Sequence, residues 1–380
     1  MINVLSIFGT RPEAIKMAPV VKALARHPEQ IRSRVCVTAQ HREMLDQVLD
    51  LFAIQPDVDL DLMQEAQTLS GLTARVFTAL EPVLVEEKPD WVLVQGDTTT
   101  VMAAALAAYY QRINLGHVEA GLRTHDKWQP FPEEINRRIA GVVADLHFAP
   151  TETARDHLLR ENVDPDRIHV TGNPVIDALH TAAAMPYDLE TGPLVGIPWE
   201  KDIILVTAHR RENFGVPLES ICAALKQAAE MYAQRIHFVY PVHLNPRVRE
   251  PVHRLLGEVK NISLLEPLDY LPLVQLMKRS YLVCTDSGGI QEEAPGLGKP
   301  VLVLREKTER PEAVAAGTVK LVGTNQKRIL GELTALLEQP AYYQQMAQAV
   351  NPYGDGRSGA RIADLLLKQG EEQKAQREII

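Results

Sequence analysis

The stretch INVLSIFGTRPEAIK, residues 2–16, predicts how the fold begins. Ile2–Phe8 is apolar enough for a strand that is buried on both faces, as in a parallel sheet. Gly9 and Thr10 then give a tight turn, and Pro12 suits the first turn of a helix. Strand, turn and helix in this order are typical of a doubly wound α/β domain.

The same alternation of apolar runs and amphipathic helical patterns continues through the first half of the chain. Further strands are predicted at Arg34–Thr38, Trp91–Gln95, Asn114–Val118, Leu146–Ala149 and Ile168–Thr171. The helices expected between strands include Glu13–Ala25, Glu43–Phe52, Leu69–Glu87 and Thr99–Tyr110. Alternation over this length predicts an α/β domain whose parallel sheet is covered on both faces.

A segment rich in proline and glycine, residues 185–199, then interrupts the pattern. The pattern resumes with predicted strands at Ile203–Thr207, Ile236–Pro241, Ile262–Leu265, Tyr281–Thr285, Val301–Leu304 and Val319–Val322. The 380 residues are thus predicted to form two Rossmann-like α/β domains, residues 1–175 and 176–359. Because ligands of such sheets bind beyond the carboxyl ends of the strands, we expect a ligand cleft between the domains.

The composition argues against several classes of protein. A formal net charge of −9 disfavours a nucleic-acid-binding protein, which normally carries a basic surplus. The three cysteines lie far apart in apolar runs, as expected for buried free thiols in a reducing cytoplasm. The N-terminal residues lack the basic segment of a signal peptide, and no apolar run is long enough to cross a membrane. We therefore expect a cytoplasmic protein that binds neither nucleic acid nor membrane.

Polar motifs follow the predicted strands of the first half. Arg11 and Lys16 lie at a helix start whose N–H groups can face an anion, although a capped helix with solvated bases is the simpler alternative. Asp97 in GDTTT, Glu119 in HVEAGLRT and Glu133 in PFPEEINRR follow other strands or open a helix. Each acid alone is compatible with helix capping or a favourable first turn. Because the ends of parallel strands meet at one edge, the three together indicate acid–base chemistry.

The second half carries a histidine and a predicted anion site. His209 in HRREN follows the first strand there and can transfer protons near neutral pH. In TDSGGIQEEAP, Ser287–Gly289 would present backbone donors at a helix N-terminus, which suits a diphosphate. Glu293 lies one turn further and can accept both hydroxyls of a ribose, while Arg310 can add a charge-assisted contact. A nucleoside diphosphate is the predicted ligand, with no role assigned to Glu292.

Motifs for other ligands are absent from the sequence. No G-x-G-x-x-G follows a strand and no G-x-x-x-x-G-K-[ST] occurs, so neither a dinucleotide site nor a P-loop is indicated. The twelve histidines form no H-x-x-x-H or Cys/His cluster, which argues against a zinc site. We therefore expect neither a metal nor a cofactor.

Together these motifs resemble those of the bacterial non-hydrolysing UDP-N-acetylglucosamine 2-epimerases. The resemblance rests on GTRPEAIKMAP, TAQHREMLDQVL, GDTTT, GHVEAGLRT, HRREN, PVHLNP, TDSGGIQEEAP, TERPEA and NPYGDG, in this order along nearly the whole chain. It implies a GT-B-type fold of two Rossmann-like domains, with a C-terminal helix, residues 360–380, that crosses back onto the first. It also implies a homodimer and cytoplasmic interconversion of UDP-GlcNAc and UDP-ManNAc for surface polysaccharides.

The implied chemistry is anti elimination of UDP to 2-acetamidoglucal, followed by reprotonation on the other face and re-addition of UDP. Such a route needs carboxylates near carbons 1 and 2 and tight retention of UDP. By resemblance the catalytic residues are Asp97, Glu119, Glu133 and His209, and which carboxylate is the base and which the acid stays open. The resemblance assigns substrate binding to Arg11, Lys16, Asp97, Glu119, His209, Leu268, Leu273, Ser287, Gly288, Gly289, Glu293 and Arg310.

Some of the matching positions differ from relatives. Leu268 and Leu273 fall in the expected uracil pocket, residues 267–273, where relatives can carry glutamine and phenylalanine. Many bacterial relatives also have an allosteric UDP-GlcNAc site, and Glu43 replaces a glutamine that some of them carry there. The positions that match this second site are Gln40, Glu43, Arg75, Glu134, Arg210 and His243.

Three alternative functions are weighed against epimerisation. A glycosyltransferase on the same fold would move the sugar from UDP to an acceptor. A hydrolysing 2-epimerase would release UDP and free ManNAc. A non-catalytic UDP-sugar sensor would have no use for the three carboxylates.

Overall fold

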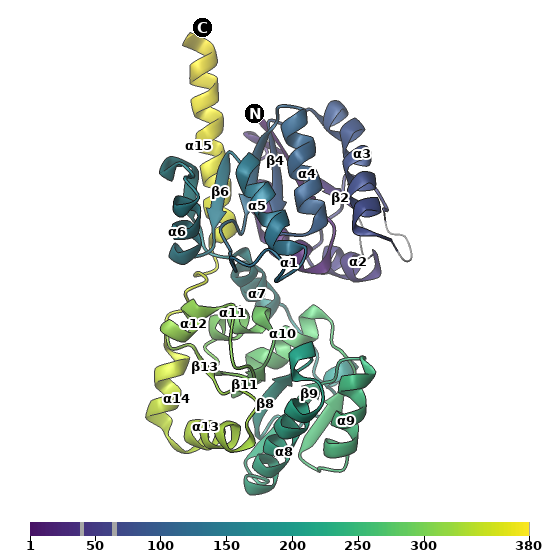
Figure 1. The fold of residues 1–380 in the computed structure, drawn as a ribbon, viewed down its shortest axis with the longest axis vertical. Helices are drawn as coiled ribbons and strands as arrows, with labels where there is room; N and C mark the ends of the chain where they lie inside the picture. Colours follow the sequence, from purple (N-terminus) through teal and green to yellow (C-terminus); the bar gives the residue numbers. More distant parts are fainter. Residues whose placement is uncertain (39–41, 63–66, 380) are drawn as a thin grey trace. The chain divides into compact units, whose positions relative to one another are not determined.

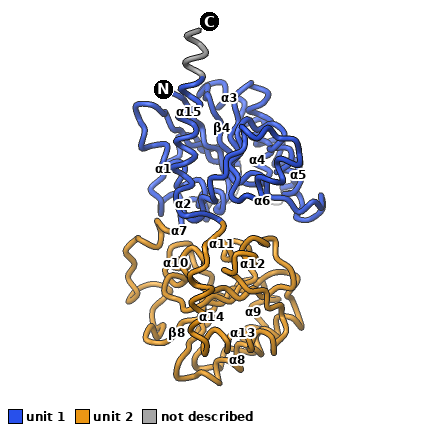
Figure 2. The backbone as a smooth tube through the Cα atoms, turned by 90° about the vertical axis from the view of Figure 1, so that its left-hand side faces the viewer, with its two compact units in different colours: residues 1–178, 353–380 blue, residues 179–352 orange. Residues whose placement is uncertain are grey.

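The computed structural model describes the backbone of residues 1–38, 42–62 and 67–379, and the side chains of the same residues except 42, 43 and 373–379. The chain divides into two compact units, which are residues 1–178 with 353–380 (unit 1) and residues 179–352 (unit 2; Figure 2). Each unit consists of a parallel β-sheet with helices packed around it (Figure 1).

Over the described residues, unit 1 holds seven parallel strands in the order β3-β2-β1-β4-β5-β6-β7. The strands are β1 (Ile2–Phe8), β2 (Ile31–Val37), β3 (Val58–Asp59), β4 (Trp91–Gln95), β5 (Asn114–Val118), β6 (Leu146–Ala149) and β7 (Ile168–Val170). The helices are α1 (Arg11–Leu24), α2 (Arg42–Leu51), α3 (Leu69–Glu87), α4 (Thr99–Tyr110), α5 (Glu133–Val143), α6 (Glu152–Arg160), α7 (Pro174–Ala184), which continues into unit 2, and α15 (Ser358–Ile379). The short edge strand β3 has no counterpart in the sequence prediction.

Unit 2 repeats this plan with six parallel strands in the order β10-β9-β8-β11-β12-β13. The strands are β8 (Asp202–Thr207), β9 (Ile236–Pro241), β10 (Ile262–Leu265), β11 (Leu282–Thr285), β12 (Val301–Val303) and β13 (Val319–Leu321). The helices are α8 (Val216–Met231), α9 (Pro246–Leu256), α10 (Tyr270–Arg279), α11 (Gly288–Gly296), α12 (Pro311–Ala315), α13 (Gln326–Glu338) and α14 (Pro340–Ala347).

The strand order reverses at the first strand of each sheet. In unit 1 the reversal lies between β1 and β4, and in unit 2 it lies between β8 and β11. In open α/β sheets the crevice beyond the strand ends at such a reversal is the usual ligand site. The motifs that follow β1, β4, β8 and β11 therefore lie where ligands of such sheets usually bind.

Local sequence sets the start of α1 at this crevice. Thr10 and Glu13 form a capping box, in which the Thr10 hydroxyl accepts from the Glu13 N–H and Glu13 Oε2 accepts from the Thr10 N–H at 2.7 Å. Glu13 Oε1 also accepts from the Thr98 hydroxyl at 2.7 Å, which ties α1 to the N-cap of α4. Burial raises the pKa of Glu13 despite these bonds.

The C-terminal helix α15 packs on α1 within unit 1. The contact requires glycine at position 359, because a Cβ there would lie 2.7 Å from the Pro19 carbonyl oxygen. The Asp177 carboxylate accepts from the N–H groups of Ser358 at 3.1 Å and Gly359 at 2.9 Å. These bonds cap α15, and residues 353–359 accordingly belong to unit 1 rather than to the second domain, where the prediction put them.

The cysteines and the helix lengths bear on two of the predictions from composition. Cys36, Cys222 and Cys284 are buried free thiols, and burial raises the pKa of each to about 12. None of the described helices is both long enough and apolar enough to cross a bilayer.

Candidate functional site

The acids predicted to be catalytic gather at the carboxyl edge of the unit 1 sheet. Asp97 follows β4, Glu119 follows β5 and Glu133 opens α5. The three side chains are close enough for the charges of Glu119 and Glu133 to act on Asp97. Strand order explains the grouping, because β4 and β5 are neighbours and α5 leads from this edge into β6.

Glu119 is a buried carboxylate surrounded by hydrogen-bond donors. Lys16 Nζ lies 2.6 Å from Oε1 and 2.7 Å from Oε2. Asn173 Nδ2 donates to Oε1 at 2.9 Å, and Gln95 Nε2 donates to Oε2. The backbone of Glu119 has a φ of +63°, a conformation that is unfavourable for a glutamate. Donors of this kind stabilise the ionised carboxylate and fix its orientation.

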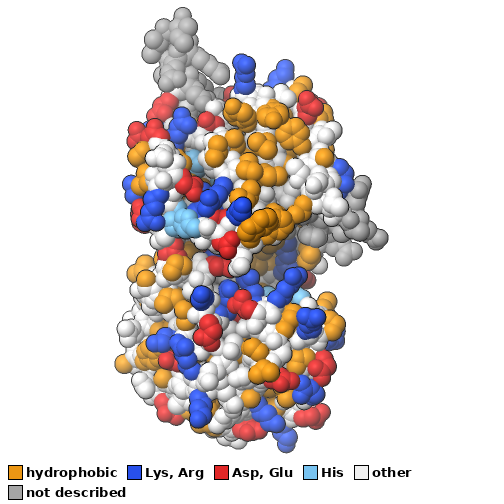
Figure 3. Space-filling view, in the orientation of Figure 1, with side chains coloured by type: hydrophobic (Ala, Val, Ile, Leu, Met, Phe, Trp, Pro, Cys, Tyr) orange, Lys and Arg blue, Asp and Glu red, His pale blue; other side chains and the backbone are white. Residues whose placement is uncertain are grey.

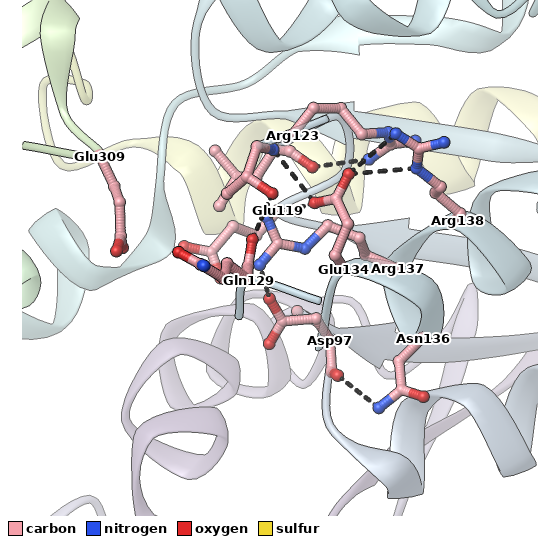
Figure 4. Close-up of polar contacts among 12 residues, drawn as sticks. Asp97, Glu119, Arg123, Gln129, Glu134, Asn136, Arg137, Arg138 and Glu309 are labelled. Atoms are coloured by element: carbon pink, nitrogen blue, oxygen red, sulfur yellow. Dashed lines mark hydrogen bonds and ion pairs between the residues drawn. The ribbon is translucent and has the colours of Figure 1, made fainter. Parts of the chain in front are cut away.

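Asp97 is bound more loosely and faces an arginine. Arg137 Nη2 donates to Asp97 Oδ2 at 2.6 Å, and Asn136 Nδ2 donates to the Asp97 backbone oxygen at 3.0 Å (Figure 4). The pKa of Asp97 is raised above its ordinary value, mainly by burial. The positive charge of Arg137 lowers this pKa, and the negative charge of Glu119 raises it. A carboxyl with a raised pKa keeps its proton to higher pH than an ordinary aspartate, which favours a role in proton transfer.

The other predicted site residues of unit 1, Glu133, Arg11 and Lys16, differ in their hydrogen-bond and ion-pair partners. Glu133 Oε2 is buried and has no hydrogen-bond partner within the described part of the chain. Arg11, in the first turn of α1, has no ion-pair partner among the described residues and is partly exposed. Lys16 is bound to Glu119 instead of being free to meet an anion. Of the two predicted anion-binding bases here, Arg11 is the one left available.

In unit 2 the predicted anion site is built around the N-terminus of α11. Ser287 is the N-cap, and Gly288 and Gly289 are the first two residues of the helix. A Cβ on Gly288 would lie 3.7 Å from Arg210 Nη2 and 3.9 Å from Arg310 Cζ. Two guanidinium groups thus flank the N–H groups of the helix start, an arrangement that suits a phosphorylated ligand.

The two adjacent acids of α11 have different surroundings. Glu293 is buried, and its Oε2 lies 3.7 Å from the position that a Cβ of Gly289 would occupy, so it reaches back to the helix start. Glu292 accepts a hydrogen bond from Arg310 Nε, and its backbone oxygen accepts from Asn351 Nδ2 at 2.9 Å. The residue without a role in the sequence analysis therefore orients Arg310.

His209 follows β8 and lies beside another histidine and an acid. Its ring stacks on that of His243 with centroids 5.3 Å apart and an interplanar angle of 11°. Its Nδ1 lies 3.6 Å from Asp286 Oδ1. Burial lowers the pKa of His209, Asp286 raises it, and His243 and Arg210 lower it, so that it lies below its ordinary value.

Comparison with known proteins identifies the family. The sequence profile of a family described as UDP-N-acetylglucosamine 2-epimerase matches residues 22–367. The chain belongs to this family. The UDP-N-acetylglucosamine 2-epimerase of Escherichia coli K12 is 58% identical over 370 aligned positions, and the alignment covers 96% of this chain and 98% of that protein. The resemblance of the sequence motifs to those of bacterial UDP-N-acetylglucosamine 2-epimerases is thereby confirmed.

Solved structures similar to this member of the UDP-N-acetylglucosamine 2-epimerase family support the fold class. The crystal structure of UDP-GlcNAc 2-epimerase from Neisseria meningitidis bound to UDP-GlcNAc has a TM-score of 0.86 and 51% identity, and covers 96% of this chain and all (100%) of that one. A glycotransferase of kitacinnamycin is similar in fold alone, with a TM-score of 0.65 at 13% identity over 97% of this chain and 98% of that one. The predicted GT-B-type fold of two Rossmann-like sheets is confirmed.

The positions that match the allosteric site of other 2-epimerases are spread over the chain. Arg75 lies on α3, Arg210 beside the start of α11, and His243 after β9. Gln40 and the side chain of Glu43 lie outside the described residues. Their allosteric role stays a prediction.

Glu134, the remaining position of this set, is fully buried next to the acid group. Its carboxylate accepts from the N–H groups of Thr124 at 3.1 Å and His125 at 3.2 Å, and from Arg138 Nε at 3.1 Å (Figure 4). Burial acts to raise the pKa of Glu134, but these donors and the charge of Arg137 bring it below its usual value. In this structure the hydrogen bonds of Glu134 thus connect the loop after Glu119 to α5.

The predicted uracil-pocket residues lie at the start of α10. Leu268 is in the loop between β10 and α10, Leu273 is in the first turns of the helix, and both are partly buried. The Leu273 N–H donates to the Asp269 carbonyl oxygen at 3.1 Å, so it takes part in the helix. Their contact with uracil stays a prediction.

Sequence reasoning missed several residues that hold the predicted ones in place. They are Glu13, Gln95, Arg137, Asn173 and Asp286. The T-x-x-E pattern of a capping box could have revealed Glu13, and a polar residue ending a buried strand could have revealed Gln95 and Asp286. Nothing in the sequence connects Asn173 with an acid 54 residues away.

Proposed function

We propose that the protein is a non-hydrolysing UDP-N-acetylglucosamine 2-epimerase, which interconverts UDP-GlcNAc and UDP-ManNAc. Family membership and the named relatives support the substrate. The observation that carries the reaction type is the group of Asp97, Glu119 and Glu133 at one sheet edge. Inversion at carbon 2 needs one group to remove a proton and another to return it on the opposite face, which such a group can supply.

In the proposed reaction a carboxylate removes the proton on carbon 2 while the bond from carbon 1 to the phosphate oxygen breaks. The electron pair of the carbon–hydrogen bond forms the double bond of 2-acetamidoglucal, and that of the carbon–oxygen bond leaves with UDP. A proton then adds to carbon 2 from the other face, and the UDP oxygen re-forms its bond to carbon 1. Atoms and electrons balance without a redox partner.

The surroundings of the three acids favour different roles. Glu119, held by Lys16 and Asn173, is suited to remain ionised and stabilise positive charge at carbon 1. Glu133 Oε2 accepts no hydrogen bond from the described residues and suits the base, while Asp97, with its raised pKa, suits the group that returns the proton. In the reverse direction these two exchange roles, as microscopic reversibility requires.

The N-terminus of α11 is proposed to bind the nucleotide. Arg210 and Arg310 beside Gly288 would neutralise the diphosphate, and Glu293 would accept the ribose hydroxyls. His209 would face the departing phosphate. Tight binding of UDP here would keep it available for re-addition instead of release.

We also propose a cytoplasmic homodimer, as other members of the family led us to expect. Figure 3 shows hydrophobic side chains gathered on the visible face of unit 1. Exposed residues on α3, α4 and α5 include Leu69, Tyr109, Tyr110, Ile135 and Val142. A pocket of about 570 Å³ opens among these helices, lined by Phe77 and Met102 among others. Apolar surface of this kind on a soluble protein marks a contact with another chain, and a second copy is the occupant we propose.

Incubation with UDP-GlcNAc in D₂O without an acceptor tests the proposed reaction. We expect deuterium at carbon 2 of both epimers and little accumulation of UDP. Stoichiometric free UDP with ManNAc would indicate hydrolysis instead. Neither exchange nor product formation until an acceptor is added would indicate a glycosyltransferase, and both outcomes would overturn the proposal.

A further inference from the structure

Asp286, which follows β11, is a fully buried carboxylate whose two oxygens have different surroundings. Oδ2 accepts from the backbone N–H groups of His209 and Arg210, both at 2.8 Å, and from Asn213 Nδ2 at 2.9 Å. Oδ1 is buried and has no hydrogen-bond partner in the described part of the chain. His209 Nδ1 lies 3.6 Å from this oxygen.

A buried carboxylate oxygen without a donor is unfavourable, so a donor in reach will be drawn to it. The His209 ring can provide one, because a small rotation would bring Nδ1 to hydrogen-bonding distance. The backbone of His209 is already fixed by Oδ2 of the same carboxylate. Asp286 therefore fixes the main chain of His209 through Oδ2 and places Oδ1 beside the His209 ring.

We propose that Asp286 is the positioning residue for His209: it accepts a hydrogen bond from Nδ1–H, sets the tautomer and directs Nε2 toward the ligand side. Because Nδ1–H donates to Asp286, Nε2 is the ring atom that can take up or release a proton. Because the proposed function places His209 at the departing diphosphate, this role rests on that function. Asp286 itself makes no contact with the substrate in this arrangement.

The charges around the ring give Asp286 a second effect. His243 stacks against His209 from the loop after β9, and Arg210 is its neighbour in the chain. Burial lowers the pKa of His209, and these two groups lower it further, whereas the negative charge of Asp286 raises it. Asp286 thus stabilises the protonated ring, the form that can assist departure of a phosphate.

The variant Asp286→Asn tests this role with little change of shape. Its amide oxygen can accept from His209 N–H, Arg210 N–H and Asn213 as Oδ2 does, so the loop is retained. Its amide nitrogen would replace Oδ1 and meet Nδ1–H with another donor. Asp145→Asn is the matched control, because the Asp145 carboxylate also accepts a backbone N–H, from Leu115 at 2.9 Å, but belongs to unit 1, whereas His209 belongs to unit 2.

The pKa of His209 can be measured by NMR on the full chain with histidine-labelled protein, assigned with His209→Gln, in the presence and absence of UDP. We expect Asp286→Asn to lower this pKa by about one unit or more. The kcat for epimerisation should fall by about 10- to 100-fold, with KM nearly unchanged and the pH profile shifted to lower pH. Asp145→Asn should change none of these.

In a His209→Gln background, Asp286→Asn should cause no further loss of activity. An unchanged pKa of His209 in Asp286→Asn, or a further loss in the double variant, would overturn the positioning role. If the wild-type protein showed no epimerisation, the proposed function would fail, while the NMR measurement would still decide whether Asp286 controls His209.

Discussion

The fully buried side chain of Asn173 donates a hydrogen bond to Glu119 Oε1 at 2.9 Å. Asn173 also donates its backbone N–H to the Tyr353 carbonyl oxygen at 2.6 Å. Position 173 precedes α7, through which the chain passes into unit 2, and Tyr353 is where it re-enters unit 1. Asn173, which orients the Glu119 carboxylate, is therefore held where the chain leaves unit 1 and where it returns to it. This gives Glu119 a rigid support.

Asn173→Asp should reduce kcat by about 100-fold or more, because it replaces a donor to Glu119 with a like charge. The side chains are nearly the same size, so loss of packing is small. Steady-state kinetics and thermal unfolding measure the two effects separately. Asn325→Asp is the control, since Asn325 caps α13 with its side-chain oxygen and aspartate caps equally well. Wild-type kcat in Asn173→Asp would contradict the role given to this bond.

Strand and helix patterns predicted most of the fold because buried parallel strands are continuous apolar runs. Of the strands in the described part of the chain, the edge strand β3, of two residues, was not predicted, since it has no apolar run of its own. The acids Asp97, Glu119 and Glu133 could be proposed from the sequence because each follows a strand or opens a helix at a shared edge. Partners such as Asn173 and Arg137 were not, because a contact across 54 or 40 residues leaves no local pattern.

Arg137→Met should shift the pH profile of kcat upward. The pKa of Asp97 is raised by burial and restrained by the charge of Arg137, so removing that charge should raise it further, by about one unit. Asp97 would then stay protonated to higher pH. Arg137→Lys keeps the charge and should leave the profile nearly in place. A profile that Arg137→Met does not move would show that Asp97 does not control the rate.

Arg310→Met should weaken UDP binding by about 10-fold or more, because it removes one of two guanidinium groups beside Gly288. Glu292→Gln should have a smaller effect in the same direction, since Glu292 orients Arg310 without facing the ligand. Isothermal titration with UDP measures both. Arg254→Met, on the exposed face of α9, is the control and should bind UDP like the wild type. Equal affinity in Arg310→Met would remove this residue from the nucleotide site.

Val142→Glu should convert the proposed dimer to a monomer. Val142 is 85% exposed on α5 within the apolar face of α3, α4 and α5, where a buried charge would oppose association. Sedimentation of the wild type and the variant at matched concentrations gives the oligomeric state. Val195→Glu, an exposed valine of unit 2, is the control and should sediment as the wild type does. A wild-type monomer, or a dimer that Val142→Glu leaves intact, would reject this face as the interface.

Acid should destabilise unit 1 through two buried histidines. Burial lowers the pKa of His117 to about 4 and that of His147 to about 3, from an ordinary value of 6.5. Below pH 6.5 the unfolded chain therefore binds protons that the folded chain does not. The free energy of unfolding should fall between pH 6.5 and about pH 4, by on the order of 3 kcal/mol per histidine.

Urea unfolding at several pH values measures this pH dependence of the free energy of unfolding. His117→Gln should flatten the pH dependence, whereas the exposed His253→Gln should not; an equal slope in both variants would contradict the assignment.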